Sequence, residues 1–172
     1  MLYSSSMKSL SFMRHAESDP NYLDNSDFDR PIKKSGLKMI KNYAEHLKKN
    51  NIRYELLFCS PALRTKQTSS YFLSVMNLKT IKVIDDYNLY EGCSENFLLR
   101  VSNLKKYQDI LVITHEPKIL FFKDFFLSNT DFWPKIQNLE IVTSSVLTIY
   151  FDIKTWNEIN ENNVQSYKFF NP

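Results

Sequence analysis

Short apolar runs and longer amphipathic segments alternate along the 172-residue chain. Short, mainly apolar runs predict strands buried on both faces of a parallel sheet, and three of them end at a polar or charged junction. In the last run Thr148 interrupts the apolar sequence, which favours a strand at the edge of the sheet. The predicted strands comprise residues 10–13, 56–59, 81–84, 110–113 and 146–151.

The segments between these runs have helical periodicity. Between Leu37 and Leu47 the apolar residues recur at intervals of three and four, and lysines occupy the opposite face. Ser60 and Pro61 form a residue pair that is typical of the N-cap and first position of a helix. The predicted helices comprise residues 37–47, 61–76, 97–104 and 117–127.

Alternating strands and helices predict one α/β domain over residues 1–172, with residues 1–6 as a loose leader. The expected architecture is a three-layer α/β/α sandwich around a mainly parallel sheet with right-handed crossovers. Ligands of such sheets bind beyond the carboxyl ends of the strands. The ends of three predicted strands are followed by His15, by a helix that carries Arg64, and by His115, so we expect these side chains to meet at one edge.

Composition narrows the kind of ligand site that is possible. The chain contains only two glycines, Gly36 and Gly92, which argues against a glycine-rich phosphate loop. A bound phosphate must therefore be held by side chains and helix N-termini. Because no acidic cluster offers Mg²⁺ ligands either, arginines must supply the positive charge around the phosphate oxygens. We therefore predict no cofactor and no metal.

Charge and cysteine content exclude several other classes of protein. The net charge is +3 and the basic residues are dispersed, so a nucleic-acid partner is not expected. The sequence contains no apolar run of membrane-spanning length and no signal-peptide pattern, so no membrane association is expected. Cys59 and Cys93 form no disulfide or metal-ligand pattern, which fits a reducing cytoplasm.

Four segments, in order, combine histidine, arginine and hydroxyl residues at predicted strand ends or helix starts. They are Arg14-His15-Ala16-Glu17, Asp29-Arg30-Pro31-Ile32 with Ser35-Gly36, Ser60-Pro61-Ala62-Leu63-Arg64-Thr65-Lys66-Gln67-Thr68, and Thr114-His115-Glu116-Pro117. Together they resemble the signature elements of the histidine phosphatase superfamily, whose fold is phosphoglycerate-mutase-like. The resemblance extends over residues 7 to about 151, with Ala16 in place of the glycine of the family signature.

Two further features resemble bacterial phosphohistidine phosphatases of the SixA type more narrowly. These are the Leu89-Tyr90-Glu91 element and Trp156 after the last predicted strand. The resemblance implies hydrolysis of phosphohistidine on a protein, with a histidine phosphotransfer domain as one possible partner. A phosphomonoesterase for a small phosphate ester is the alternative, and a non-catalytic phosphate-binding regulatory module is the second alternative.

Chemistry and resemblance assign the same roles to the site residues. A neutral imidazole is a competent nucleophile near neutral pH, and we assign this role to His15. His115 is expected to stabilise the transferring phosphoryl group as a second imidazole. Arg14, Arg30 and Arg64 are expected to bind its oxygens. His46 lies on the lysine-rich helix and is predicted to be a surface residue.

The proton donor is left open among three possibilities. Glu91 follows the fourth predicted strand, where the mutase-like branch carries its acid, and is the preferred candidate. Glu116 directly follows His115, where the acid phosphatase branch carries an aspartate. The third possibility is that no acid is needed, because the N–P bond of phosphohistidine is already labile. Ser60 and Thr65 are interpreted as capping and packing residues.

Overall fold

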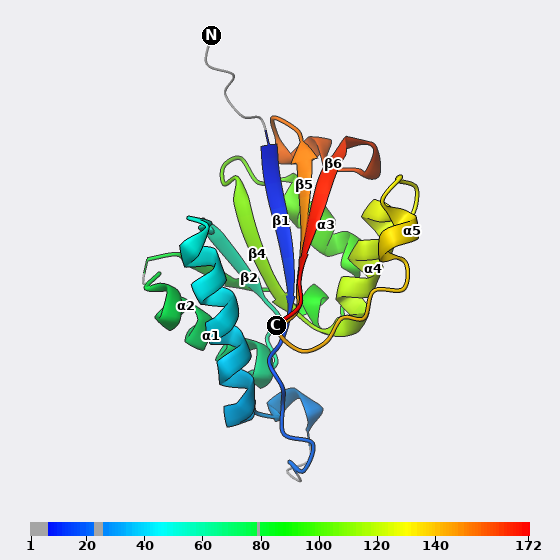
Figure 1. Ribbon diagram of the computed structural model, residues 1–172. Coiled ribbons are helices and arrows are strands. Elements are labelled where there is room, and N and C mark those ends of the chain that lie inside the picture. Colours follow the sequence, from blue (N-terminus) through cyan, green and yellow to red (C-terminus); the bar gives the residue numbers. More distant parts are fainter. Residues whose placement is uncertain (1–6, 23–25, 79) are drawn as a thin grey trace.

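The computed structural model describes residues 7–22, 26–78 and 80–172, so the expected leader over residues 1–6 lies outside the described residues. Within this part of the chain, six strands form one sheet in the order β3-β2-β4-β1-β5-β6 (Figure 1). The strands are β1 (Met7–Arg14), β2 (Leu56–Cys59), β3 (Lys82–Asp85), β4 (Asp109–Thr114), β5 (Val146–Asp152) and β6 (Val164–Phe170).

Helices connect the strands. The α-helices are α1 (Lys34–Lys49), α2 (Leu63–Met76), α3 (Ser94–Ser102), α4 (Glu116–Leu127) and α5 (Trp133–Ile136). The 3₁₀ turns are η1 (Asp27–Asp29), η2 (Tyr87–Leu89), η3 (Trp156–Glu158) and η4 (Glu161–Asn163). In the described part of the chain, no helix combines the length and apolar character that crossing a membrane requires.

The predicted three-layer sandwich around a mainly parallel sheet is confirmed. Strands β1, β2, β3 and β4 pair in parallel, and β5 runs antiparallel to both β1 and β6. Helices α1 and α2 lie on one side of the sheet, and α3 and α4 lie on the other (Figure 1). The α1–α2 side is packed through Met13, Ile40 and Phe72, which belong to one buried cluster.

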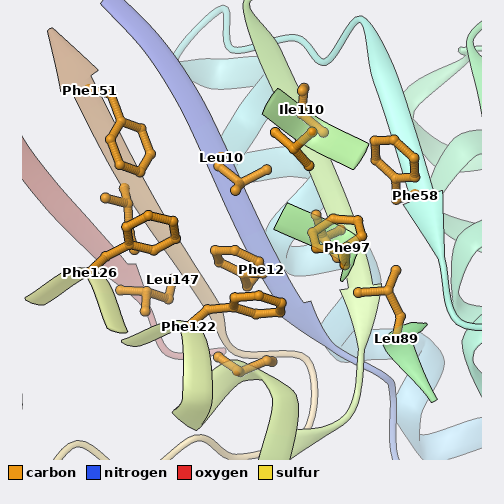
Figure 2. Close-up of a cluster of buried hydrophobic side chains, with 14 of the residues drawn as sticks. Leu10, Phe12, Phe58, Leu89, Phe97, Ile110, Phe122, Phe126, Leu147 and Phe151 are labelled. Atoms are coloured by element: carbon orange, nitrogen blue, oxygen red, sulfur yellow. The ribbon is translucent and has the colours of Figure 1, made fainter. Parts of the chain in front are cut away.

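The second and larger cluster fills the space between the sheet and helices α3 and α4. Leu10 and Phe12 point from β1 toward this side, as the two-residue period of a strand requires. Phe12 stacks on Phe122 of α4 with ring centroids 4.5 Å apart (Figure 2). Phe97 of α3 packs edge-on against Phe58 at 5.2 Å. These contacts hold β1 and β2, two of the strands from which the site is built, against α4 and α3.

The predicted edge position of residues 146–151 is wrong. Strand β5 is interior, because β6 covers its outer side. Thr148 is accommodated inside the sheet because its hydroxyl hydrogen bonds with the Ser11 hydroxyl of β1 at 2.8 Å. Strand β6 was not predicted, since its alternation of half-buried polar and aromatic residues is too weak to separate it from a packed terminus.

The predicted start of the second helix is also wrong. Helix α2 begins at Leu63 with Ala62 in the N-cap position, rather than at Ser60 and Pro61. The Ser60 carbonyl instead accepts a hydrogen bond from the Thr65 hydroxyl at 2.7 Å, and the Ser60 amide bonds to Ile113 of β4 at 3.0 Å. Ser60 is therefore held as part of the strand end, with its hydroxyl free to face the site.

The pairing register of β1, β2 and β4 explains why their carboxyl ends form one site. Arg14 pairs with Thr114 across β1 and β4, and Cys59 pairs with Ile113 across β2 and β4. His15 and His115 consequently leave β1 and β4 at the same level, and Ser60 leaves β2 one residue earlier. In Figure 1 these carboxyl ends converge at the lower edge of the sheet, above the loop that carries η1.

Candidate active site

Two imidazoles face each other at the carboxyl edge of the sheet. His15 directly follows β1 and His115 directly follows β4, and their ring centroids lie 5.2 Å apart at an interplanar angle of 60°. The side chains are enclosed, because His15 is 7% exposed and His115 is 8% exposed. The His15 amide donates to the Thr114 carbonyl at 2.9 Å, which ties the first histidine to the neighbouring strand.

Arg64 determines the tautomers of both rings. Its Nε lies 3.3 Å from His15 Nε2 and its Nη2 lies 3.2 Å from His115 Nδ1. Because a guanidinium only donates hydrogen bonds, each of these ring nitrogens carries a lone pair. The other nitrogens then carry the protons. His15 Nδ1 donates to the Ala16 carbonyl at 2.7 Å, and His115 Nε2 donates to the Ser60 hydroxyl at 2.8 Å. His15 Nε2 is thus an unprotonated nitrogen aimed at Arg64.

Both imidazoles are neutral at pH 7. Burial lowers the pKa of His15 to about 4, with further lowering by the charges of Arg64, Arg14 and Arg30, while the hydrogen bond to the Ala16 carbonyl opposes the shift. Burial, followed by the charge of Arg64, lowers the pKa of His115 to about 3. A neutral His15 keeps its Nε2 lone pair available over the physiological pH range.

These lowered pKa values predict a loss of stability in mild acid. The usual pKa of histidine, 6.5, applies in the unfolded chain, so between pH 6.5 and about 4 the unfolded state binds more protons than the folded state. The free energy of unfolding should therefore fall as pH is lowered below 6.5, by at most about 1.4 kcal/mol per pH unit for each histidine. Urea unfolding at pH 7, 6 and 5 measures this slope.

His15→Gln and His115→Gln should each make that slope shallower. The matched control is His46→Gln, because His46 lies exposed on α1, as predicted from the sequence. This control should keep the wild-type slope. A slope unchanged in both site variants would contradict the assignment of neutral buried imidazoles.

Arg14, the last residue of β1, directly precedes His15 and contacts the start of α4. Its Nη1 donates to the Ile141 carbonyl at 2.5 Å, and its Nη2 forms an ion pair with Glu116 at 3.0 Å. Its Nε is buried and has no hydrogen-bond partner among the described residues. A buried donor without a partner is costly, and an anion bound beside His15 can satisfy it.

Arg64 is the most enclosed of the three arginines, at 5% exposed. As the second residue of α2, it lies at a helix N-terminus, which favours bound anions. Besides the two imidazoles, it donates to the Asp27 carbonyl at 2.5 Å and to the Asp27 carboxylate at 2.8 Å. Its guanidinium carbon also lies 5.9 Å from the centre of the Tyr90 ring.

Arg30 joins the site from the loop after η1. Its Nε and Nη2 both contact Asp27 Oδ1, at 3.1 and 2.8 Å, and its Nη1 donates to the Ser18 hydroxyl at 2.6 Å. Partial burial alone would raise the pKa of Asp27. The hydrogen bond from Arg30 and the charges of Arg64 and Arg30 outweigh this effect, so the pKa is lowered and Asp27 is ionised.

The structure brings five of the six predicted site residues together: His15, His115, Arg14, Arg30 and Arg64. It places the sixth, Glu91, on the exposed rim, where the carboxylate accepts a hydrogen bond from the Tyr87 hydroxyl at 2.9 Å. Glu116, by contrast, forms an ion pair with Arg14 of the site. The role of Glu91 as proton donor stays a prediction, and it requires the carboxylate to turn toward the histidines.

Three residues of the site were missed from the sequence. Asp27 bridges Arg30 and Arg64, and its only sequence signal is its spacing of three residues from Arg30. Ser60 was interpreted as a cap, although it contacts His115. Tyr90 lies with its ring centroid 5.3 Å from that of His115, and its hydroxyl is 3.4 Å from Asp27 Oδ2. Its position next to Glu91 was the available signal.

Ala16 fits where the family signature has glycine. Positive φ values of non-glycine residues occur elsewhere in the described chain, at Asn51, Asn77, Tyr107 and Ser144, so the backbone of Ala16 needs no glycine conformation. Its methyl group has room because Gly36 at the start of α1 has no side chain. A Cβ at Gly36 would lie 3.0 Å from the Ala16 Cβ, closer than ordinary van der Waals contact.

The site is built for a tetrahedral oxyanion. Guanidinium groups from three different segments lie close enough to His15 for their charges to lower its pKa, and Arg64 contacts its unprotonated Nε2 directly. The described residues include no group of three or more histidine, cysteine, aspartate or glutamate side chains able to hold a metal ion. Such an arrangement can bind a phosphoryl group by its oxygens and present His15 Nε2 to the phosphorus atom.

Solved structures with a similar fold include several phosphoryl-transfer proteins. A protein of Agrobacterium tumefaciens assigned as the phosphohistidine phosphatase SixA has a TM-score of 0.75 and 18% identity, covering 96% of this chain and 98% of that one. The protein histidine phosphatase SixA in complex with tungstate has a TM-score of 0.68, 20% identity and 94% coverage of both chains.

Phosphoglycerate mutase of Bacillus anthracis is similar with a TM-score of 0.62 and 13% identity, over 86% of this chain and 89% of the mutase. The predicted phosphoglycerate-mutase-like fold is therefore confirmed. Among curated proteins, the DNA-directed RNA polymerase subunit beta' of Oedogonium cardiacum is 31% identical over 101 residues. That segment is 58% of this chain but only 5% of the polymerase subunit, so it supports no shared activity.

A family model describes the first half of the fold. The model of the histidine phosphatase superfamily, branch 1, matches residues 10–96, which include His15, Arg30 and Arg64. The match agrees with the fold of the similar solved structures. The chain belongs to the histidine phosphatase superfamily.

Proposed function

We propose that the protein hydrolyses phosphohistidine on a protein substrate, through a phosphohistidine intermediate on His15. One observation carries the proposal: Arg64 contacts both imidazoles and leaves His15 Nε2 unprotonated beside a cluster of arginine donors. A lone pair next to fixed positive charge is what attack on a phosphoryl group requires.

The reaction consists of two displacements at phosphorus. In the first, Arg64 Nε gives up its hydrogen bond to His15 Nε2, and the freed lone pair of Nε2 forms a bond to phosphorus while the bond to the leaving nitrogen of the substrate imidazole breaks. The leaving nitrogen keeps that electron pair, and the substrate imidazole departs neutral because its other ring nitrogen already carries a proton. In the second, water attacks the phosphorus, the bond to His15 Nε2 breaks, the water proton is lost to solvent or a site base, and inorganic phosphate leaves. Arg14, Arg30 and Arg64 hold the phosphoryl oxygens throughout.

His115 responds to the charge of the phosphoryl group. Its lowered pKa applies to the free site, where Arg64 faces its Nδ1. A bound phosphoryl dianion adds negative charge and draws the Arg64 donors onto its oxygens. Both changes favour protonation of His115 Nδ1, which then donates to a phosphoryl oxygen. In this state the second imidazole stabilises the transferring group, as the sequence suggests.

The rim of the site supports a macromolecular substrate. The Asp27 side chain, which contacts Arg64, is 56% exposed, and Tyr87, whose ring centroid lies 6.2 Å from that of Tyr90, is 57% exposed, so the rim around the buried histidines faces solvent. Within the described chain, β3, η2 and α3 connect α2 to β4 without an inserted domain. A histidine side chain on a folded partner, such as a histidine phosphotransfer domain, can approach such a rim. We expect no nucleic-acid partner and no membrane association.

Two further properties follow from the proposal. The reaction needs neither a metal nor a cofactor, because the arginines supply the positive charge. A reducing cytoplasm suits the two cysteines, since Cys59 and Cys93 are both free thiols in the structure.

A small-molecule phosphomonoesterase is the second candidate, and the position of Glu116 favours it. An ester leaves as an alkoxide and needs a proton, and Glu116 is the carboxylate that contacts the site through Arg14. Phosphohistidine needs less help, because its leaving imidazole can already be protonated near neutral pH.

Comparing the two substrate classes tests the proposal. The two substrates are a phosphohistidine-bearing protein and p-nitrophenyl phosphate. We expect a higher kcat/KM for the phosphohistidine-bearing protein, and we expect this activity to be unchanged in EDTA. Glu116→Gln should slow ester hydrolysis by roughly 10²–10⁴-fold and phosphohistidine hydrolysis much less. Glu91→Gln is the matched variant on the rim, and an effect there instead would assign the acid to Glu91. A higher kcat/KM for esters would make the second candidate correct.

A further inference from the structure

The carboxylate of Asp27 occupies the arginine pair that a phosphoryl group would use. Its Oδ1 accepts two hydrogen bonds from Arg30, at 3.1 and 2.8 Å, and its Oδ2 accepts one from Arg64 at 2.8 Å. The Tyr90 hydroxyl lies a further 3.4 Å from Oδ2. Two oxygens thus take three donors from two arginines, through charge-assisted hydrogen bonds of the kind that arginines also make to phosphate.

This arrangement is not needed to satisfy a buried carboxylate. More than half of the Asp27 side chain, 56%, is exposed, and an exposed carboxylate is well hydrated without ion pairs. The buried member of the pair is Arg64, whose side chain is 6% exposed. A buried guanidinium without an anion is costly, so the contact compensates the charge of Arg64 more than that of Asp27.

We propose that Asp27 is a resident anion of the free enzyme, which holds Arg30 and Arg64 at the site and is exchanged for the phosphoryl group when substrate binds. This inference rests on the proposed function, since it takes Arg30 and Arg64 as phosphate ligands. The exchange sets the affinity of the site. Only the fraction of molecules in which the carboxylate has released the arginines is competent to bind, and the apparent dissociation constant rises accordingly.

The exchange also gives the site a preference for highly charged anions. A monoanion with two oxygens offers the arginines no more than Asp27 already provides. A phosphoryl dianion offers three oxygens and a second negative charge, so it can displace the carboxylate. Asp27 is therefore a specificity-determining residue as well as a competitor.

The loop that carries Asp27 can stay in place during the exchange. The Ser26 hydroxyl accepts a hydrogen bond from the Phe28 amide at 3.2 Å and caps η1. The Phe28 ring packs edge-on against Tyr90 with centroids 5.2 Å apart. Because these contacts anchor both sides of Asp27, rotation of its own side chain is enough to release Arg30 and the Nη2 of Arg64, while the Asp27 carbonyl keeps its hydrogen bond to Arg64 Nη1.

Tungstate binding to the intact protein tests the inference without turnover. Titration calorimetry at pH 7.5 should give a dissociation constant for Asp27→Asn that is lower than that of the wild type. The expected change is roughly three- to thirty-fold, the range that one or two exposed carboxylate–arginine pairs account for. The isosteric amide keeps the shape of the side chain but removes its charge. Thermal melting of both proteins confirms that the variant is folded.

Asp29→Asn is the matched control. Asp29 belongs to the same 3₁₀ turn and is exposed, and no hydrogen bond or ion pair is found for its side chain among the described residues. Its substitution removes the same charge from nearly the same place. Tungstate affinity should change less than about two-fold, since an exposed charge that is not in contact is largely screened. An equal gain in both variants would reduce the effect to general electrostatics and overturn the inference.

The outcomes separate this inference from the proposed function. If the wild type binds tungstate and Asp27→Asn binds it equally or more weakly, Asp27 positions the arginines or is indifferent, and only the resident-anion inference fails. If the wild type binds no tungstate at millimolar concentration, the arginine cluster is not a phosphate site. Both the inference and the proposed function then fail.

Discussion

Replacing His15 by alanine should reduce turnover by a factor on the order of 10⁴ or more, because it removes the atom that accepts the phosphoryl group. The fold should persist. The His15 side chain bonds to the adjacent Ala16 carbonyl and to Arg64, whereas the packing of β1 rests on Leu10 and Phe12. The measurement is kcat on the preferred substrate together with a thermal melt of the same protein.

The control for this substitution is His46→Ala. His46 is exposed on α1, so the variant should keep wild-type turnover. Activity of His15→Ala above about a hundredth of wild type would contradict covalent catalysis by this residue, given the size of the losses on removing a nucleophile.

Arg64→Lys should produce the second largest effect. Lysine keeps the positive charge, but a single ammonium cannot contact both imidazoles, Asp27 and a phosphoryl group as the guanidinium fork does. We expect kcat/KM to fall by roughly 10³–10⁵-fold, the range over which a transition-state arginine contributes to phosphoryl transfer. Steady-state kinetics on the phosphohistidine substrate measures this loss.

Arg53→Lys provides the comparison, because Arg53 is exposed and precedes β2, at the opposite end of that strand from Ser60. It should leave kcat/KM unchanged. Retention of more than about a tenth of wild-type kcat/KM by Arg64→Lys would mean that charge alone is sufficient and that the fork geometry has no special role.

The residues that the sequence placed correctly are those whose position follows from strand topology. His15, Arg64 and His115 come after apolar runs, and the ends of parallel strands meet at one edge of a sheet whatever the loops do. The fold class was predictable for the same reason, since alternating strands and helices allow few arrangements.

The residues that were missed depend on loop geometry. Asp27 lies next to Arg64 only because the segment between β1 and α1 passes beneath the strand ends (Figure 1). Tyr90 rather than Glu91 faces His115 because of the local turn after η2. Neither periodicity nor residue type encodes such turns strongly enough to be read from one sequence.

The two wrong predictions about the fold have a related cause. The edge position predicted for residues 146–151 was wrong because β6 covers β5, and because the Ser11 and Thr148 hydroxyls hydrogen bond between strands that are adjacent in the sheet but distant in sequence. The predicted start of α2 was wrong because the Ser60 hydroxyl bonds to His115 and the Ser60 carbonyl accepts from Thr65, so Ser60 does not cap the helix. In each case hydrogen bonds to other segments, rather than the preference of the residue type, determined the outcome.

Trapping the phosphoenzyme tests the central claim most directly. The wild-type protein is mixed briefly with a substrate that carries a labelled phosphoryl group, and the reaction is quenched in alkali, in which phosphohistidine is stable. Mass spectrometry of the digested protein should locate one phosphoryl group on His15, and the label should be lost in acid and absent from His15→Ala. Steady turnover with no label on His15, or label on another residue such as Ser60, would contradict the account.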